Sequence, residues 1–224
     1  QTEEQLEIKS QESDILIQNI LPKAIAERRK QGEATIADNF KQVTILNAHL
    51  AGLSQLNKRL SPQEMRKLLT ELFDEFDSAA ERYGLERQNS ATTSYMAVCG
   101  LSEVRFDHSK RTVDFALVML EIIQRLNVNY NSPLALRISN HAGSVTAGVV
   151  GTERFGYKIW GETAYIASSL QSQADLNYIL LTQSVYERIA DSYTFIQNPA
   201  VKIQGLGEVE TWTLVSTRKL VLSQ

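Results

Sequence analysis

The stretch AGVVGTERFGYKIWGETAYIASSL, residues 147–170, decides the fold more than any other part of the chain. Four glycines in it permit tight backbone paths between short apolar segments; they are Gly148, Gly151, Gly156 and Gly161. Tyr157 and Trp160 add large apolar side chains, which serve packing within the fold or contacts with a second chain. The segment 162–174 predicts a helix directly after this glycine-rich region.

Strands and helices alternate on both sides of this stretch. Ser61 followed by Pro62 is typical of an N-cap and a first helical residue, and predicts an amphipathic helix that runs to about Tyr83. A second helix is expected near 109–127. Short strands are expected at 42–48, twice within 85–99, at 134–142 and 145–150 with a turn at 142–143, and near 178–181 and 208–215. This order predicts an α/β (α+β) sandwich with helices packed on a largely antiparallel sheet.

Residues 1–38 differ from the rest, because they are polar and helix-prone and contain a helix breaker at Pro22. The step of seven residues from Ile8 to Ile15 makes a short heptad. We expect a signalling or connector helix here, although a helix that only packs on its own domain has the same pattern.

Composition limits the classes of function. The chain has 224 residues, which suits one domain with an appendage, and its net charge of −3 favours neither nucleic acid nor anionic lipid as a partner. Cys99 is the only cysteine, so an internal disulfide is excluded and a reducing compartment is expected. No apolar run approaches the roughly 20 residues of a membrane span, and the charged start is no signal peptide. We expect a cytoplasmic protein, which can be the cytoplasmic part of a membrane-anchored receptor; the start at Gln suggests a piece of a longer protein.

Five further stretches, taken with 147–170, resemble the class III nucleotide cyclases over roughly residues 40–215. They are VTILNAHLAGL at 43–53, SPQEMRKLLTELFDEFD at 61–77, TTSYMAVCGL at 92–101, RISNHAGSVTAGVVG at 137–151 and QGLGEVETWTL at 204–214. The resemblance implies a ferredoxin-like cyclase fold. It also implies that residues 19–40, NILPKAIAERRKQGEATIADNF, act as the connector that joins sensor or transmembrane modules to the catalytic domain in many bacterial cyclases.

The resemblance also identifies the positions that would bind metal. Class III cyclases hold two metal ions with two aspartates, in motifs like FADIVGF and GDAYMAV. The corresponding stretches here are NAHLAGL and TTSYMAV, which place His49 and Thr93 at the aspartate positions. Magnesium prefers carboxylate oxygen, whereas imidazole suits zinc or copper and a lone hydroxyl is a poor anchor. We therefore expect no metal cofactor, with His49 as a structural residue.

The remaining family positions have changed in the same way. The base-reading positions carry Asn89 and Lys158, and the ribose and transition-state positions on the helix after IWG carry Tyr165 and Ser169. The KGKG turn that contacts the terminal phosphates is QGLG here, with Leu206 in place of its second lysine. An uncharged hydroxyl at 169 cannot replace a bidentate cation.

From these positions we expect three units, namely a connector at 1–38, a cyclase homology domain at 39–216 and a tail at 217–224. The leading hypothesis is a catalytically inactive domain, a pseudoenzyme that dimerises and serves intracellular signal transduction. One alternative is a sensor that binds a nucleotide or another small molecule without turnover. Another is an adenylate or guanylate cyclase with weak residual activity.

The family places each active site across a head-to-tail dimer, so the expected partners are a second copy or a related cyclase, with a sensor module upstream. In the family, one chain supplies the metal ligands of a site and the other supplies its base, ribose and transition-state residues. Because this chain has changed both sets, we expect it to inhibit a competent partner in a mixed dimer.

Overall fold

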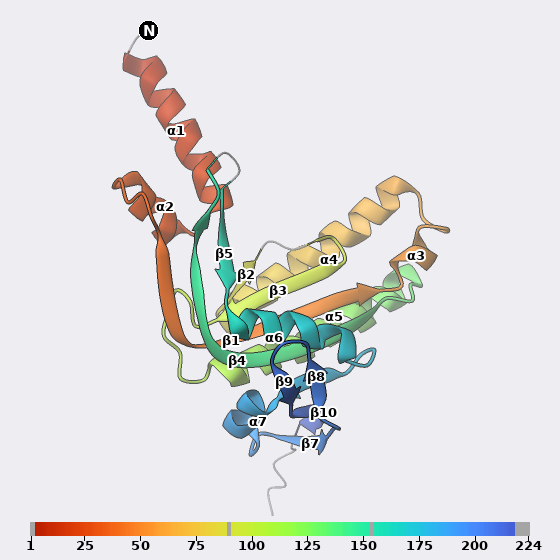
Figure 1. The fold of residues 1–224 in the computed structure, drawn as a ribbon. Coiled ribbons are helices and arrows are strands. Elements are labelled where there is room, and N and C mark those ends of the chain that lie inside the picture. The colour runs from red at the N-terminus through yellow and green to blue at the C-terminus, as the bar shows by residue number, and fades with distance from the viewer. Residues whose placement is uncertain (1–2, 89–90, 153–154, 218–224) are drawn as a thin grey trace, which may run out of the picture.

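The computed structural model describes residues 3–88, 91–152 and 155–217. Within them an eight-stranded sheet has seven strands in the order β2-β3-β1-β4-β6-β10-β7 (Figure 1). The eighth strand, β5, pairs with β4 over residues 146–150. All pairs are antiparallel except β4 with β6. This is the predicted α+β fold with a mostly antiparallel sheet and flanking helices.

The strands and helices have the following bounds. The strands are β1 (Ala37–Ala51), β2 (Leu85–Gln88), β3 (Ser94–Cys99), β4 (Ala135–Val150), β5 (Gly156–Trp160), β6 (Ile179–Thr182), β7 (Tyr193–Gln197) and β10 (Thr211–Thr217), with β8 (Val201–Ile203) and β9 (Gly207–Val209) in a separate hairpin. The helices are α1 (Glu3–Ile20), α2 (Lys23–Lys30), α3 (Leu53–Leu56), α4 (Pro62–Tyr83), α5 (His108–Tyr130), α6 (Glu162–Leu170) and α7 (Gln183–Ile189), and a 3-10 turn follows α6 at Gln171–Gln173.

Two apolar cores lie on opposite faces of the sheet because side chains alternate along a strand. Leu46, Ala48 and Leu50 of β1 pack with α4 and α5 in the larger core. Val43 and Ile45 contribute to a second core, which contains residues of α2, β5 and α6. Helix α6 therefore covers the face opposite to α4 and α5, as Figure 1 shows.

Helix α4 forms where the sequence predicted it, and its ends explain why. Ser61 and Glu64 make a capping box, in which Ser61 Oγ accepts from the Glu64 N–H at 3.3 Å and Glu64 Oε2 accepts from the Ser61 N–H at 2.7 Å. Gly84 ends the helix in the left-handed conformation, with φ of 77°. Leu68, Leu72 and Phe76 form its buried stripe.

Helix α1 has no buried residue and projects away from the sheet (Figure 1). Its apolar side chains are exposed, among them Leu6, Ile8, Ile15 and Leu16. Pro22 lies between α1 and α2, and α2 buries Ile25 and Ala26 against the domain. No helix in the described ranges is long and apolar enough to cross a membrane.

Several predicted boundaries were wrong. The turn expected at 142–143 does not exist, because β4 continues through Gly143 while it pairs with β1. Gly143 is needed for close packing instead, since a Cβ there would lie 2.4 Å from Thr163 Oγ1 of α6. Strand β1 extends well beyond 42–48, and α6 stops at Leu170, four residues before the predicted end. Elements β5, α7, β7 and the β8–β9 hairpin were not predicted.

The half-buried His141 makes stability depend on pH. Its Nδ1 lies 2.8 Å from Thr182 Oγ1, and burial lowers the pKa of His141 from 6.5 to about 4. Above pH 6.5 neither folded nor unfolded chain binds this proton, whereas between pH 6.5 and 4 only the unfolded chain does. The free energy of unfolding should therefore fall by up to about 3 kcal/mol as the pH falls through this window. Urea denaturation between pH 4.5 and 8 should show a flatter profile for His141→Gln, and parallel profiles would contradict this assignment.

Candidate functional site

The two positions predicted to replace metal ligands lie side by side at one end of the sheet. His49 of β1 is half-buried and pairs with Ser94 of β3. Thr93, which precedes β3 in an exposed turn, accepts at its carbonyl from the Leu50 N–H at 2.7 Å. The pairing of β3 with β1 thus brings positions 49 and 93 together, although they are 44 residues apart in the chain.

The register places a third functional group at this edge. Arg137 of β4 is directly opposite His49, so both side chains project from the same face of the sheet. Arg137 is half-buried, and its Nη1 donates to the Ala174 carbonyl at 2.5 Å. Within the described ranges its guanidinium forms no ion pair.

His49, Thr93 and Arg137, here called the edge group, do not suit a divalent metal. The edge group offers an imidazole, a threonine hydroxyl and a guanidinium in place of carboxylates. Of these, the guanidinium repels a cation. In the part of the chain that the structure describes, no three His, Cys, Asp or Glu side chains group closely enough to hold an ion. The magnesium or manganese ions that the resemblance implies therefore do not fit these residues.

A second group of predicted positions lies on the outer side of α6. Tyr165 and Ser169 are one turn apart, and Ser169 Oγ donates to the Tyr165 carbonyl at 2.8 Å. The Tyr165 hydroxyl donates to the Gln204 carbonyl at 3.1 Å, which connects α6 to the turn between β8 and β9. Leu206 follows in that turn with 40% of its surface exposed. The structure thus brings Tyr165, Ser169 and Leu206 into one region, here called the α6 group.

The two base-reading positions give different outcomes. Lys158 is exposed on β5, opposite Gly148 of β4, so its ammonium group remains in water. Asn89 lies outside the described residues.

The edge group and the α6 group are separate within one chain. No hydrogen bond or ion pair among the described residues joins His49 or Thr93 to Tyr165, Ser169 or Leu206. Helix α6 turns its other side to the sheet, where Ser139 Oγ donates to the Ala167 carbonyl at 3.2 Å.

One apolar core connects the N-terminal helices with the α6 region. Leu21, Ile25 and Ala26 pack in the same cluster as Tyr157 of β5 and Ala167 of α6. At Gly148, a Cβ would lie 2.2 Å from the Ile36 carbonyl, so the chain just before β1 lies directly against β4. The N-terminal segment is therefore in packing contact with the elements that carry Lys158 and Tyr165.

Charged contacts hold α2 in place around this core. Arg28 pairs with Glu33 through two hydrogen bonds, of 2.6 and 2.7 Å, and also pairs with Asp38 at the start of β1. Lys30 Nζ lies 2.8 Å from Asp14 of α1, and the guanidinium of Arg29 lies 4.3 Å from the centre of the Phe155 ring. Such half-exposed pairs add little stability singly, but together they fix the orientation of α2.

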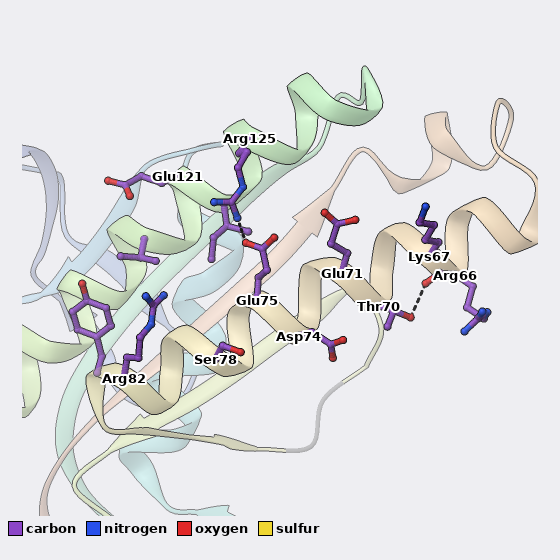
Figure 2. A pocket seen from close by; sticks show the side chains of 13 residues that line it. Arg66, Lys67, Thr70, Glu71, Asp74, Glu75, Ser78, Arg82, Glu121 and Arg125 are labelled. Carbon is purple, nitrogen blue, oxygen red and sulfur yellow. Dashed lines mark hydrogen bonds and ion pairs between the residues drawn. The ribbon is translucent and has the colours of Figure 1, made fainter.

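The groove between α4 and α5, about 770 Å³ in volume, is not at either group of predicted positions. Figure 2 shows that charged side chains of both signs line it, with Arg125 of α5 reaching Glu75 of α4. It lies on the face that carries the larger core, whereas α6 covers the other face. The groove is therefore separate from both the edge group and the α6 group.

Sequence reasoning missed Arg137. It stands in the quoted stretch RISNHAGSVTAGVVG, but nothing in the spacing places it beside His49. Only the register of β4 on β1 shows that it faces the edge group.

The comparisons agree on one family. Residues 36–216 match the family model for the adenylate and guanylate cyclase catalytic domain. An adenylate cyclase of Mycobacterium tuberculosis is 32% identical over 214 residues, covering 95% of this chain and 48% of that protein. A membrane guanylyl cyclase of Dictyostelium discoideum is 30% identical over 84% of this chain and 13% of that protein. The chain therefore spans about half, or less, of the length of these relatives.

Solved structures show the same fold. The guanylate cyclase domain of RhGC from Catenaria anguillulae, solved in complex with GTP, matches with a TM-score of 0.75 and 26% identity, covering 81% of this chain and 100% of that one. The adenylyl cyclase CyaB from P. aeruginosa matches with a TM-score of 0.77 at 21% identity, over 82% of this chain and 97% of that one. With the family match over most of its length, the chain belongs to the class III adenylate and guanylate cyclase catalytic domain family.

Proposed function

We propose that this domain is a catalytically inactive cyclase homology domain that dimerises and serves as a regulatory module in signal transduction. The observation that carries the proposal is the chemistry of the edge group. His49, Thr93 and Arg137 offer an imidazole, a hydroxyl and a guanidinium where the reaction would need anionic oxygen to hold metal ions. Without these ions, the reacting phosphates lose the divalent counter-charge on which the reaction depends.

The α6 group supports the same conclusion independently. Ser169 uses its hydroxyl on the Tyr165 carbonyl, and Leu206 offers no charge at all. Tyr165 donates its hydroxyl to Gln204 rather than leaving it free for a ligand. Loss of one preorganised electrostatic group typically lowers a rate by about 100-fold to 1,000-fold; the α6 group lacks a cation and the edge group lacks carboxylates to hold metal ions.

Signal transmission rests on the shared apolar core. A shift of α2 would displace Leu21 and Ile25, which pack with Tyr157 and Ala167, and interiors packed this closely transmit strain. We assign residues 1–38 to a connector, 39–216 to the cyclase homology domain and 217–224 to a tail. The connector would receive its signal from a module upstream, in the cytoplasm.

Dimerisation is supported by surface chemistry. Trp160, Tyr165 and Leu206 are all at least 40% exposed, and the first two stand next to the junction of β5 and α6. Large apolar and aromatic side chains left exposed are typical of an interface, and Tyr165 and Leu206 lie close together through the Tyr165–Gln204 hydrogen bond. The exposed Leu6, Ile8, Ile15 and Leu16 of α1 also lack apolar cover within the described part of a single chain.

The proposed absence of a metal site predicts that carboxylates placed at positions 49 and 93 create Mn²⁺ binding. Electron paramagnetic resonance should detect no saturable Mn²⁺ site in the wild-type chain at millimolar concentration. The double substitution His49→Asp with Thr93→Asp should create one, because it places two carboxylates at neighbouring positions, beside the hydrogen bond from the Leu50 N–H to the carbonyl of residue 93. His49→Asn with Thr93→Asn is the matched neutral control. Saturable Mn²⁺ binding by wild type that His49→Ala abolishes would contradict the proposal.

A mixing experiment tests the regulatory role. When this chain is titrated into a purified, catalytically competent relative, cyclic nucleotide production should fall, because each shared site would lack the residues that this chain must supply. Trp160→Glu, which places a charge on the proposed interface, should inhibit less at equal concentration. A rise in the relative's activity on mixing would contradict the proposed role.

A further inference from the structure

A small cavity lies where the connector meets the domain. Its volume is about 350 Å³, within the size range of small-molecule sites. The connector contributes Asn19, Ile20 and Pro22, and the domain contributes Glu86, Gln88 and Tyr157. It is distinct from the edge group, the α6 group and the groove of Figure 2, since none of their residues lines it.

Two polar side chains of this cavity are buried. Gln88 and Tyr157 are each only 7% exposed, and both line the cavity. Within the described ranges neither the Gln88 carboxamide nor the Tyr157 hydroxyl takes part in a hydrogen bond with protein. In the described part of the chain, neither side chain has a fully buried polar atom without a partner, so their polar atoms are reached from the cavity, where a ligand or an ordered water can meet them.

The charged groups of the cavity are already engaged elsewhere. Glu86 Oε1 accepts from the Ser102 N–H at 2.8 Å. Arg87, which also lines the cavity, pairs with Asp77 at 2.9 Å and lies over the rings of Phe73 and Tyr95. What remains for recognition inside the cavity is the carboxamide of Gln88 and the phenol of Tyr157, with the exposed carboxamide of Asn19 at its rim and the apolar walls of Ile20 and Pro22.

The chemistry of these two groups indicates the class of ligand. A carboxamide offers one donor and one acceptor side by side, which match the N–H and C=O of another planar amide. Burial raises the pKa of Tyr157 to about 12, so its hydroxyl stays protonated at neutral pH and can donate. Glu86 and Arg87 both line the cavity with opposite charges and are engaged elsewhere, so no net charge there favours an ionic ligand.

We propose that this cavity is a binding site for a small, uncharged, planar amide or lactam, held by the carboxamide of Gln88 and the hydroxyl of Tyr157. Because α1, the Pro22 turn, β2 and β5 all contribute walls, an occupant restrains the connector relative to the domain. The site goes beyond the proposed function and is independent of it, since it needs neither metal nor turnover.

Isothermal titration calorimetry with nicotinamide and uracil tests the proposal, with nicotinate as the charged analogue of nicotinamide. Nicotinamide or uracil should bind with one-to-one stoichiometry, and nicotinate should bind at least about tenfold more weakly than nicotinamide. Gln88→Leu and Tyr157→Phe should each weaken binding of the amide by about tenfold, which corresponds to loss of one hydrogen bond to a buried group.

Tyr178→Phe and Gln173→Leu are matched controls, because both residues are exposed and neither lines the cavity. They should leave binding unchanged. Tyr157→Phe removes a single oxygen, so it keeps the test valid if Gln88→Leu unfolds the chain. The proposal is overturned if neither amide binds, if nicotinate binds as well as nicotinamide, or if binding is insensitive to Tyr157→Phe. Since the readout is binding alone, these results stand apart from any test of cyclase activity.

Discussion

The long antiparallel pair of β1 and β4 is the constraint on which the rest of the structure depends. It runs from Ala37 and Gly148 at one end to Ala51 and Ala135 at the other, with an irregularity between Phe40 and Val43. One side of this pair packs against α4 and α5, and the other packs against α6 and the N-terminal helices. The same pair sets His49 opposite Arg137 and aligns Gly148 with Lys158 through β5. The β1–β4 ladder of backbone hydrogen bonds thus carries both apolar cores and sets the places of His49 and Arg137, and β5 extends it to Lys158.

On the proposed function, this arrangement lets a cyclase fold persist while its chemistry is replaced. The residues that hold the ladder and its two cores are apolar or glycine, and they contribute to stability whatever stands at the site positions. His49, Tyr165, Ser169 and Leu206 lie at the surface of this frame and are each half-buried or exposed. Substitution there changes charge and metal affinity with little effect on packing. A family match over residues 36–216 consequently establishes the fold more firmly than the activity.

Much of the fold could be predicted from sequence, because its signals are local. The cap at Ser61, the stripe of α4 and the apolar run of α5 specify their elements through nearest neighbours. The unbroken course of β4 could not be predicted, since Gly143 is required by the distant Thr163 rather than by a turn. The pairing of positions 49 and 93 followed from the resemblance, whereas Arg137 and the cavity beside Gln88 and Tyr157 depend on register and tertiary contacts that no local pattern encodes.

Turnover by the purified chain tests the central claim most directly. The chain would be incubated with millimolar ATP or GTP and Mn²⁺, and cyclic AMP and cyclic GMP would be quantified by mass spectrometry against a heat-denatured blank. The account predicts no product above the blank for either nucleotide, because the edge of β1 and β3 has no carboxylate pair to hold the metal. Product that rises linearly with protein concentration, and that is lost in His49→Ala, would contradict it.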